Sequence, residues 1–213
     1  MKRKQSKFYQ NYLDNKLKLK TYQKVGIVLL VVVISGFIGW VWEFIINEIE
    51  GGFQHLYIEG GNLLPWINLY AYGALLIMIV TYRLRRYPWL VFVVAFFATG
   101  ILELLAGWLA YMVYGGTRYW DYSGIWWGIG NIDGFVCPAS AFCFGLGGLL
   151  LNYALLPFCT KLSLTMTKRK FLTLSITLFT IIMIDDIVNL TLKTCNLPTA
   201  MDFYYSIGWR YLN

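Results

Sequence analysis

Residues 26–47, GIVLLVVVISGFIGWVWEFIIN, decide the fold class, because they contain only one charged side chain, Glu43. Roughly 20 apolar residues in a helix cross a hydrocarbon core of about 30 Å, so the stretch predicts a transmembrane helix. The apolar run from Gly26 to Trp42 is too long for a signal peptide, and no small-x-small cleavage site follows it. We therefore expect this first helix to stay in the membrane.

Four more apolar segments follow, at residues 64–83, 88–114, 134–158 and 171–191. Hydrophobic residues make up 58 % of the 213 residues and charged residues 14 %, against about 45–50 % and about 25 % in soluble domains. The composition predicts an all-α, polytopic membrane helix bundle with five transmembrane helices, in contact with membrane lipid. It excludes a soluble nucleic-acid-binding protein despite the net charge of +7, and also a disordered chain or a disulfide-rich secreted scaffold.

Positive charge predicts the orientation of the helices, because cytoplasmic loops retain Lys and Arg. Fifteen of the 18 Lys and Arg residues fall before the first helix, between the second and third, or between the fourth and fifth. We therefore expect a cytoplasmic N-terminus and an outer C-terminus. The chain then divides into a basic amphipathic cytoplasmic tail (1–25), a transmembrane domain (26–191) and an outer C-terminal tail (192–213). The basic tail is either a helix lying on anionic lipid or a plain topogenic flank.

The same topology places every acidic residue except Asp14 in the outer half of the membrane or beyond it. Four of these acids lie inside predicted helices, where a charge at the bilayer centre costs about 2.5–3.5 kcal/mol on insertion scales. They either mark an acidic cavity, link helices through hydrogen bonds, or reach the headgroups. The four residues are Glu43, Glu103, Asp185 and Asp186. The last two are adjacent and point about 100° apart on a helix, so one of them is expected to face the bundle interior, and the sequence does not say which.

The outer loop 115–133, GGTRYWDYSGIWWGIGNID, is rich in polar and aromatic residues. Asp121, Asn131 and Asp133 either close over the intramembrane acids or, in the case of Asn131 and Asp133, cap the helix that follows. Carboxylates with amides suit a divalent cation or a cationic or hydroxyl-rich group, but their spacing assigns no metal. Arg118 and Asp121 would pair if this stretch were helical. Aromatic residues on this side form a headgroup belt or the walls of a pocket, and the candidates for the walls are Trp40, Tyr70, Trp108, Trp120 and Tyr122.

Two other features receive structural interpretations. Gly145, Gly147 and Gly148 give the segment 134–158 a small face for close helix packing, so we expect that helix at the centre of the bundle. His55 is the only histidine in the chain, and we expect it on the surface of an outer loop.

Four stretches occur in a characteristic order: GWVWEFI (39–45), PWINLYAYG (65–73), ILELLAGWLAYMVYGGTRYWDYS (101–123) and NIDGFVC (131–137). Together they resemble the CmpB-like family of type IV ABC-transporter permeases over roughly residues 36–150. The resemblance implies a small protein of the bacterial cytoplasmic membrane with a role in transport. The residues that fit the family pattern are Glu43, Pro65, Tyr70, Gly73, Glu103, Trp120, Asp121, Tyr122, Ser123, Asn131 and Gly134.

The chain departs from this pattern at two places where the family has an arginine. The N-R-G ahead of the second helix is Ile58, Glu59 and Gly60 here, and the arginine after N-I-x-G is Phe135. These departures remove two cations that the family places near the acids, so a shared substrate does not follow from the resemblance.

Three classes of function fit these features. The favoured one is a transporter permease subunit with an outward-facing acidic intramembrane cavity for a cation or a small polar or cationic solute. Because the chain has no G-x-x-x-x-G-K-[ST] motif, it would need a separate ATPase subunit, and five helices would need a homodimer to enclose a path. The second class is an intramembrane enzyme that acts on a lipid or polyprenyl substrate through acid–base chemistry or a divalent metal. The third is a non-catalytic interaction or immunity protein.

Overall fold

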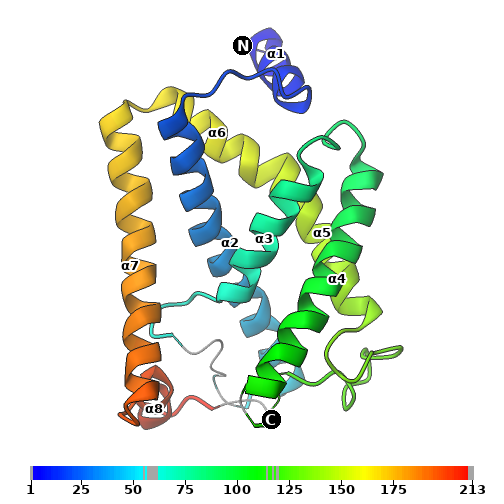
Figure 1. Cartoon of the computed structure of the whole chain (residues 1–213), viewed down its shortest axis with the longest axis vertical. Coiled ribbons are helices and arrows are strands. Elements are labelled where there is room, and N and C mark those ends of the chain that lie inside the picture. The colour runs from blue at the N-terminus through cyan, green and yellow to red at the C-terminus, as the bar shows by residue number, and fades with distance from the viewer. Residues whose placement is uncertain are drawn as a thin grey trace. The chain divides into compact units, whose positions relative to one another are not determined.

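The computed structural model describes residues 2–54, 56, 62–113, 115–116, 118 and 120–210, with side chains from residue 7 onward. The described residues contain no strand, so the all-α prediction is confirmed. The helices in chain order (Figure 1) are α1 (Lys2–Leu13), α2 (Thr21–Glu50), α3 (Asn68–Thr81), α4 (Pro88–Val113), α5 (Pro138–Leu150), the π-helical turn η1 (Leu151–Leu155), α6 (Leu156–Thr165), α7 (Lys168–Thr194) and α8 (Ala200–Ser206).

The chain folds as two compact units. Unit 1 comprises Met1–Lys18 and Gly73–Phe158, and unit 2 comprises Leu19–Tyr72 and Cys159–Asn213. Unit 1 therefore holds α1, most of α3, α4, α5 and η1. Unit 2 holds α2, α7, α8 and most of α6.

In the described part of the chain, four helices are long and apolar enough to cross a membrane: α2, α4, α7 and the continuous helix Pro138–Thr165, which joins α5, η1 and α6. They correspond to the segments predicted at 26–47, 88–114, 171–191 and 134–158. The last of these begins four residues later than predicted and extends beyond residue 158. Its late start has a backbone cause, because Asp133 and Gly134 have φ angles of 49° and 72°, outside the right-handed helical region, and Cys137 is an extended N-cap before Pro138.

The segment predicted as a transmembrane helix at 64–83 is only partly helical. α3 has 14 residues, about 21 Å at 1.5 Å per residue, which is short of the roughly 30 Å hydrocarbon core. Residues 64–67 precede the helix without joining it. Pro65 explains this limit, since proline has no backbone N–H and disfavours helical geometry in the residue before it. The prediction of a full-length helix over 64–83 is therefore wrong at its N-terminal end.

Small residues set the packing inside each unit. In unit 1, a Cβ added to Gly148 would lie 2.5 Å from the Cβ of Ala95, and one added to Gly145 would lie 2.6 Å from Phe92, so α5 and α4 pack at close range. This confirms the small face predicted for the segment 134–158, although Gly147 meets nothing within 4 Å. In unit 2, Gly26 accommodates the ring of Phe171 in the same way, which brings the N-terminal ends of α2 and α7 together.

The helix from α5 to α6 widens into a π turn, and Pro157 accounts for it. The ring of a proline inside a helix clashes with the carbonyl four residues earlier, here that of Tyr153, and removes one hydrogen bond of the ladder. The carbonyl oxygens of Asn152 and Tyr153 accept hydrogen bonds from the hydroxyls of Tyr12 (2.7 Å) and Tyr9 (3.3 Å). The predicted basic tail is thus helical in α1. Tyr9 and Tyr12, however, bind the protein itself, whereas one of the two interpretations has this helix lying on lipid.

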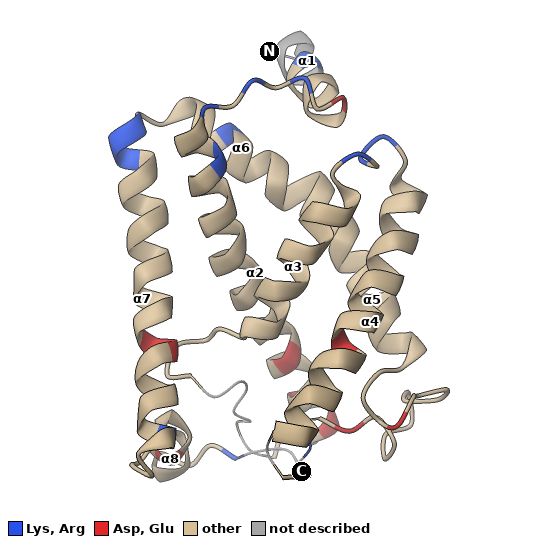
Figure 2. Cartoon of the chain, viewed as in Figure 1, with Lys and Arg blue, Asp and Glu red and all other residues tan. Residues whose placement is uncertain are grey.

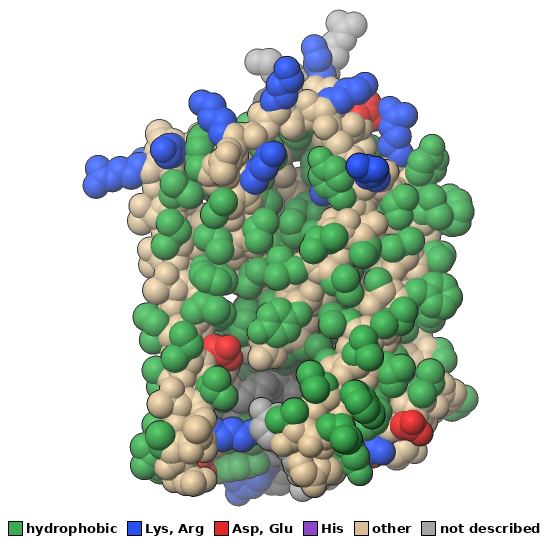
Figure 3. Space-filling model, viewed as in Figure 1, with side chains coloured by type: hydrophobic (Ala, Val, Ile, Leu, Met, Phe, Trp, Pro, Cys, Tyr) green, Lys and Arg blue, Asp and Glu red, His purple; other side chains and the backbone are tan. Residues whose placement is uncertain are grey.

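Charge is segregated along the helices of each unit considered by itself (Figure 2). In unit 1 most basic residues lie on or just after α1 and in the α3–α4 turn, whereas Glu103 lies in the C-terminal half of α4 and Arg118 in the loop after it. In unit 2 residues 168–170 are basic and open α7, whereas the acidic residues of α2 and α7 lie in their C-terminal halves. On the face that Figure 3 shows, hydrophobic side chains cover most of the helix surfaces between these ends, as a lipid-facing surface requires.

Candidate functional site

Glu103 of α4 is the centre of a polar cluster in unit 1. Its side chain is 3 % exposed. The Tyr122 hydroxyl donates to its Oε1 at 2.6 Å, and the Ser140 hydroxyl donates to its Oε2 at 2.8 Å. Both carboxylate oxygens are therefore hydrogen-bonded, which is the condition for keeping such a group in an apolar surrounding.

The loop after α4 is folded so that Tyr122 reaches Glu103. The Tyr122 amide donates to the carbonyl of Gly134 at 2.9 Å, and the indole N–H of Trp120 donates to the carbonyl of Phe135 at 2.8 Å. Gly107 on α4 permits this approach, because a Cβ there would lie 2.9 Å from the Phe135 ring. Two of the predicted pocket-wall residues, Trp120 and Tyr122, thus fix the loop against the helix that carries the acid.

Arg118 organises the exposed side of the same loop. Its guanidinium pairs with Asp121 at 3.4 Å and donates to the backbone carbonyl of Asp133. The predicted pair forms although the stretch is not helical. The Ser123 hydroxyl and amide donate to Asp121 at 2.6 and 2.8 Å and hold its pKa below the ordinary value, with a smaller contribution from Arg118.

Asn131 and Asp133 do not cap α5, so that interpretation is wrong. The N-cap is Cys137, whose sulfur accepts from the Ser140 amide at 3.3 Å. Asn131 instead closes a turn, since its Oδ1 accepts from the Gly134 amide at 2.9 Å. The side chain of Asp133 is exposed, and only its carbonyl is engaged by Arg118.

Phe135 stands where the resembling family has an arginine, and its ring supports a different cation. The Arg118 guanidinium lies 4.7 Å from the centre of that ring, a distance at which a cation is attracted to an aromatic face. A positive charge is therefore present beside this loop, supplied from residue 118.

Glu43 of α2 is the corresponding acid of unit 2. The hydroxyl of Tyr70 donates a hydrogen bond to its Oε1. Gly39, one turn earlier on α2, makes room for this tyrosine, because a Cβ there would lie 2.1 Å from the Tyr70 ring. Trp40 was predicted as a wall beside this acid, and its ring stacks on Phe44 at 5.3 Å.

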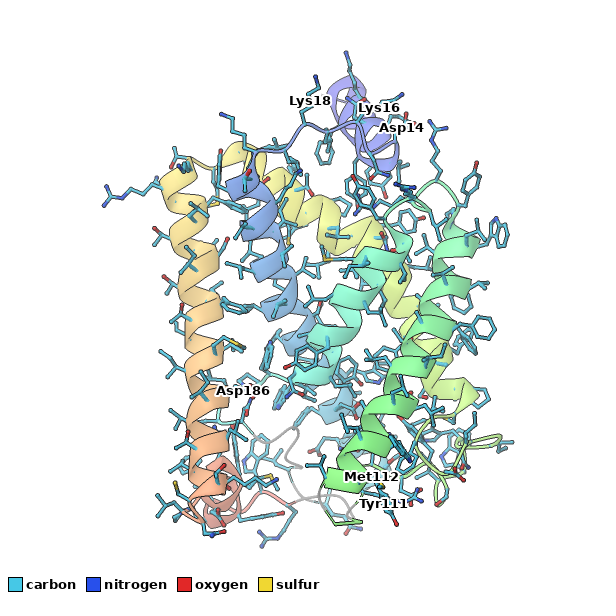
Figure 4. All side chains as sticks on the ribbon, viewed as in Figure 1. Asp14, Lys16, Lys18, Tyr111, Met112 and Asp186 are labelled. Carbon is cyan, nitrogen blue, oxygen red and sulfur yellow. The ribbon has the colours of Figure 1, made fainter. Side chains whose placement is uncertain are left out.

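Asp185 and Asp186 lie on α7 beside the non-helical segment 62–67 of the same unit. Asp185 accepts from the backbone amides of Leu63 (3.2 Å) and Leu64 (2.8 Å) and from the Asn189 side chain (2.8 Å). Asp186 projects toward the same segment (Figure 4) and accepts one longer bond, 3.3 Å from Asn62. Non-helical backbone at membrane depth needs such partners because lipid supplies none, so Asp185 has a structural explanation.

The predicted site residues thus fall into separate places. Glu103, Asp121, Asn131 and Asp133 belong to unit 1, and Glu43, Asp185 and Asp186 to unit 2. Trp108 is 54 % exposed on α4. His55 and Glu59 lie outside the described residues. Among the described residues, no group of three or more His, Cys, Asp or Glu side chains is placed to hold a metal ion, so the expected divalent cation has no ligand set in that part of the chain.

Sequence reasoning missed Ser140 and Arg85. Ser140 stands three residues after Cys137 in a capping box, which is the signal that could have drawn attention to it. Arg85 is only 9 % exposed, and its guanidinium binds the side chains of Asn15 (3.1 Å) and Asn152 (3.3 Å). An arginine in this turn is expected from the positive-inside rule alone. Nothing in the sequence therefore indicated that Arg85 also holds the end of α1 in place.

Comparison with known proteins gives one match. The model of the family described as "Putative ABC-transporter type IV" matches residues 30–190. No curated protein matches the chain, and no solved structure matches it. The matched range includes the acids and hydroxyls described above, namely Glu43, Tyr70, Glu103, Tyr122, Ser140, Asp185 and Asp186.

Proposed function

Since this chain belongs to the family described as "Putative ABC-transporter type IV", we propose that it is the permease subunit of a transporter, with its N-terminus in the cytoplasm. Four apolar membrane-length helices and the shorter α3 suit a multi-pass membrane protein of that kind. The orientation is supported by the basic residues of α1 and the α3–α4 turn in unit 1 and of residues 168–170 in unit 2. The sequence has no P-loop motif, so ATP hydrolysis would come from a separate subunit.

The observation that carries the proposal is an intramembrane glutamate in each unit that receives a tyrosine hydroxyl. Tyr70 donates to Glu43 in unit 2, and Tyr122 donates to Glu103 in unit 1. Ionisable groups inside membrane helices are costly and mark solute or ion pathways by default. We infer that each of these carboxylates, within its own unit, is a contact point for a cation or a small polar or cationic solute.

A pull-down from native membranes tests the transporter assignment. The tagged chain is extracted in a mild detergent, and the preparation is assayed for vanadate-sensitive ATP hydrolysis. We expect an ATPase subunit to co-purify, and we expect neutralisation of residues 168–170 to glutamine to release it, because this basic start of α7 is on the proposed cytoplasmic side.

Lys193→Gln is the matched control, since it removes one charge from the opposite end of the same helix, and it should leave co-purification unchanged. Absence of an ATPase from the wild-type preparation would reject the assignment to an ATP-driven transporter.

A second candidate is an enzyme acting on membrane lipid, and one observation in unit 1 favours it. An apolar groove of about 240 Å³ lies between α4 and the start of α5, with Gly100, Leu104, Cys137 and Ala141 among its lining residues. Pro138 and Ala141 line this groove, and Ser140, whose hydroxyl donates to Glu103 at 2.8 Å, lies between them in the sequence. Mass spectrometry of native lipid extract incubated with the wild type and Ser140→Ala tests this candidate, and unchanged lipids reject it.

A further inference from the structure

Unit 2 contains an apolar groove that neither glutamate lines. It has a volume of about 240 Å³ and lies between α2, α7 and the non-helical segment before α3. Val33 and Phe37 are near the middle of α2, so the groove is level with the middle of that helix. Its other walls include Leu64, Trp66, Ile181 and Ile182.

The wall made by the non-helical segment is fixed to both neighbouring helices. On the α2 side, the Ile67 amide donates to the carbonyl of Gly36 at 3.1 Å, and the Trp66 indole donates to the carbonyl of Val32 at 3.3 Å. On the α7 side, the amide of Leu64 donates to Asp185 at 2.8 Å. Hydrogen bonds to both helices therefore fix the wall of this groove within unit 2.

Two carboxylates, Asp185 and Asp186, follow the groove-lining residues Ile181 and Ile182 by about one turn of α7. Ile182 lines the groove, and Asp186, four residues further on, lies on the same face of α7 about one turn away, roughly 6 Å along the axis. The three hydrogen bonds to Asp185 occupy that residue, whereas Asp186 has the single 3.3 Å bond from Asn62. Asp186 therefore keeps more of its hydrogen-bond accepting capacity than Asp185 does.

We propose that this groove binds a hydrophobic organic cation, with the apolar body against Ile181, Ile182 and Trp66 and the cationic group toward Asp186. The proposal rests on the proposed transport function and names a substrate class for it. An inorganic cation would need several oxygen ligands, which the apolar walls do not supply, and a neutral alkyl chain would leave Asp186 without a counter-charge. The volume lies below the usual 300–1,000 Å³ of ligand pockets, which favours a small or only partly enclosed body.

Binding of radiolabelled methyltriphenylphosphonium to the purified protein in detergent tests the proposal. We expect saturable binding to the wild type and an affinity about ten-fold lower in Asp186→Asn, because the counter-charge in a region of low dielectric is gone. Triphenylphosphine oxide, which has nearly the same shape without the charge, should not displace the label. Glu50→Gln is the matched control, since it neutralises an exposed acid at the end of α2 in the same unit, and its affinity should equal that of the wild type.

Ile182→Trp provides an independent variant, because it fills the groove and keeps the carboxylate, and it should also weaken binding about ten-fold. Non-saturable uptake of the label, displacement by the neutral oxide, or wild-type affinity in both Asp186→Asn and Ile182→Trp would overturn the proposal. Size-exclusion elution and thermal unfolding identify a misfolded variant, in which case the other variant decides. The binding assay contains no ATPase, so its result is independent of the pull-down. If the cation binds but no ATPase co-purifies, only the proposed function is rejected. If an ATPase co-purifies but the cation does not bind, only this site is rejected.

Discussion

Replacement of Asp185 by alanine should destabilise unit 2 strongly, because this carboxylate holds non-helical backbone inside the membrane. The substitution removes three hydrogen bonds, two of them from the backbone amides of Leu63 and Leu64. Hydrogen bonds to charged groups contribute about 1.5–3 kcal/mol in soluble proteins, while interhelical bonds in a membrane protein average about 0.6 kcal/mol. Between these limits, Asp185→Ala should lower the free energy of unfolding by about 2–4 kcal/mol, and Asp185→Asn, which keeps one acceptor oxygen, by about half as much.

The assay is unfolding in mixed micelles of a mild detergent and dodecyl sulfate, followed by tryptophan fluorescence. Asp186→Ala is the matched control, since it removes only the 3.3 Å bond from Asn62, and it should cost less than about 1 kcal/mol. A free energy of unfolding for Asp185→Ala within about 0.5 kcal/mol of the wild type would refute the structural role given to this residue.

Three further predictions concern unit 1. Gly134→Ala should destabilise the loop after α4 by at least about 1 kcal/mol, because the φ angle of Gly134 is 72° and a Cβ would lie 2.2 Å from Asp121 Oδ1. The same unfolding assay measures this, and a variant as stable as the wild type would contradict it. Tyr12→Phe should weaken the binding of α1 to the π turn by about 1 kcal/mol, because it removes the hydrogen bond to the Asn152 carbonyl. Proteolysis should then remove α1 faster, and an unchanged cleavage rate would contradict this contact. The pKa of Asp121 is lowered in the folded chain from an ordinary 3.8, so its stabilising effect should be complete above pH 3.8 and lost as the pH falls through the lowered value. Iodide quenching of tryptophan should rise over that acid range in the wild type and not in Asp121→Asn, and equal titrations would contradict the role of this carboxyl.

The long helices could be predicted from sequence because their apolar runs match the thickness of a bilayer. The start of α3 was predicted too early because the apolar run was followed across Pro65, and because the contact between Leu64 and Asp185, residues that are 121 positions apart, is not visible in the sequence. The N-terminal limit of α5 was missed although Pro138 marks it, since proline is favoured at the first position of a helix. The φ angles of Asp133 and Gly134, by contrast, are not visible in an apolar run.

The candidate site was predictable only in part. The cost of burying a charge singled out Glu43 and Glu103, and Tyr70 and Tyr122 were expected near them as pocket walls. Their roles as hydrogen-bond donors depend on packing, and so does the contact of Ser140 with Glu103 across 37 residues. Asp185 is the opposite case, a buried acid with a structural role. The free-energy cost of placing this carboxylate in a membrane helix is offset by the hydrogen bonds that it accepts from backbone amides.

Transport by the reconstituted complex tests the central claim, that the passage of a solute through this chain depends on each of its two intramembrane glutamates. The chain and its co-purified ATPase are placed in vesicles loaded with a mixture of polar and cationic solutes, and ATP-dependent changes in their contents are followed by mass spectrometry. We predict that at least one solute moves with the wild type, and that Glu43→Gln or Glu103→Gln stops the movement while ATP hydrolysis continues. Equal movement in the wild type and both variants, or no ATP-dependent movement with the wild type, would contradict it.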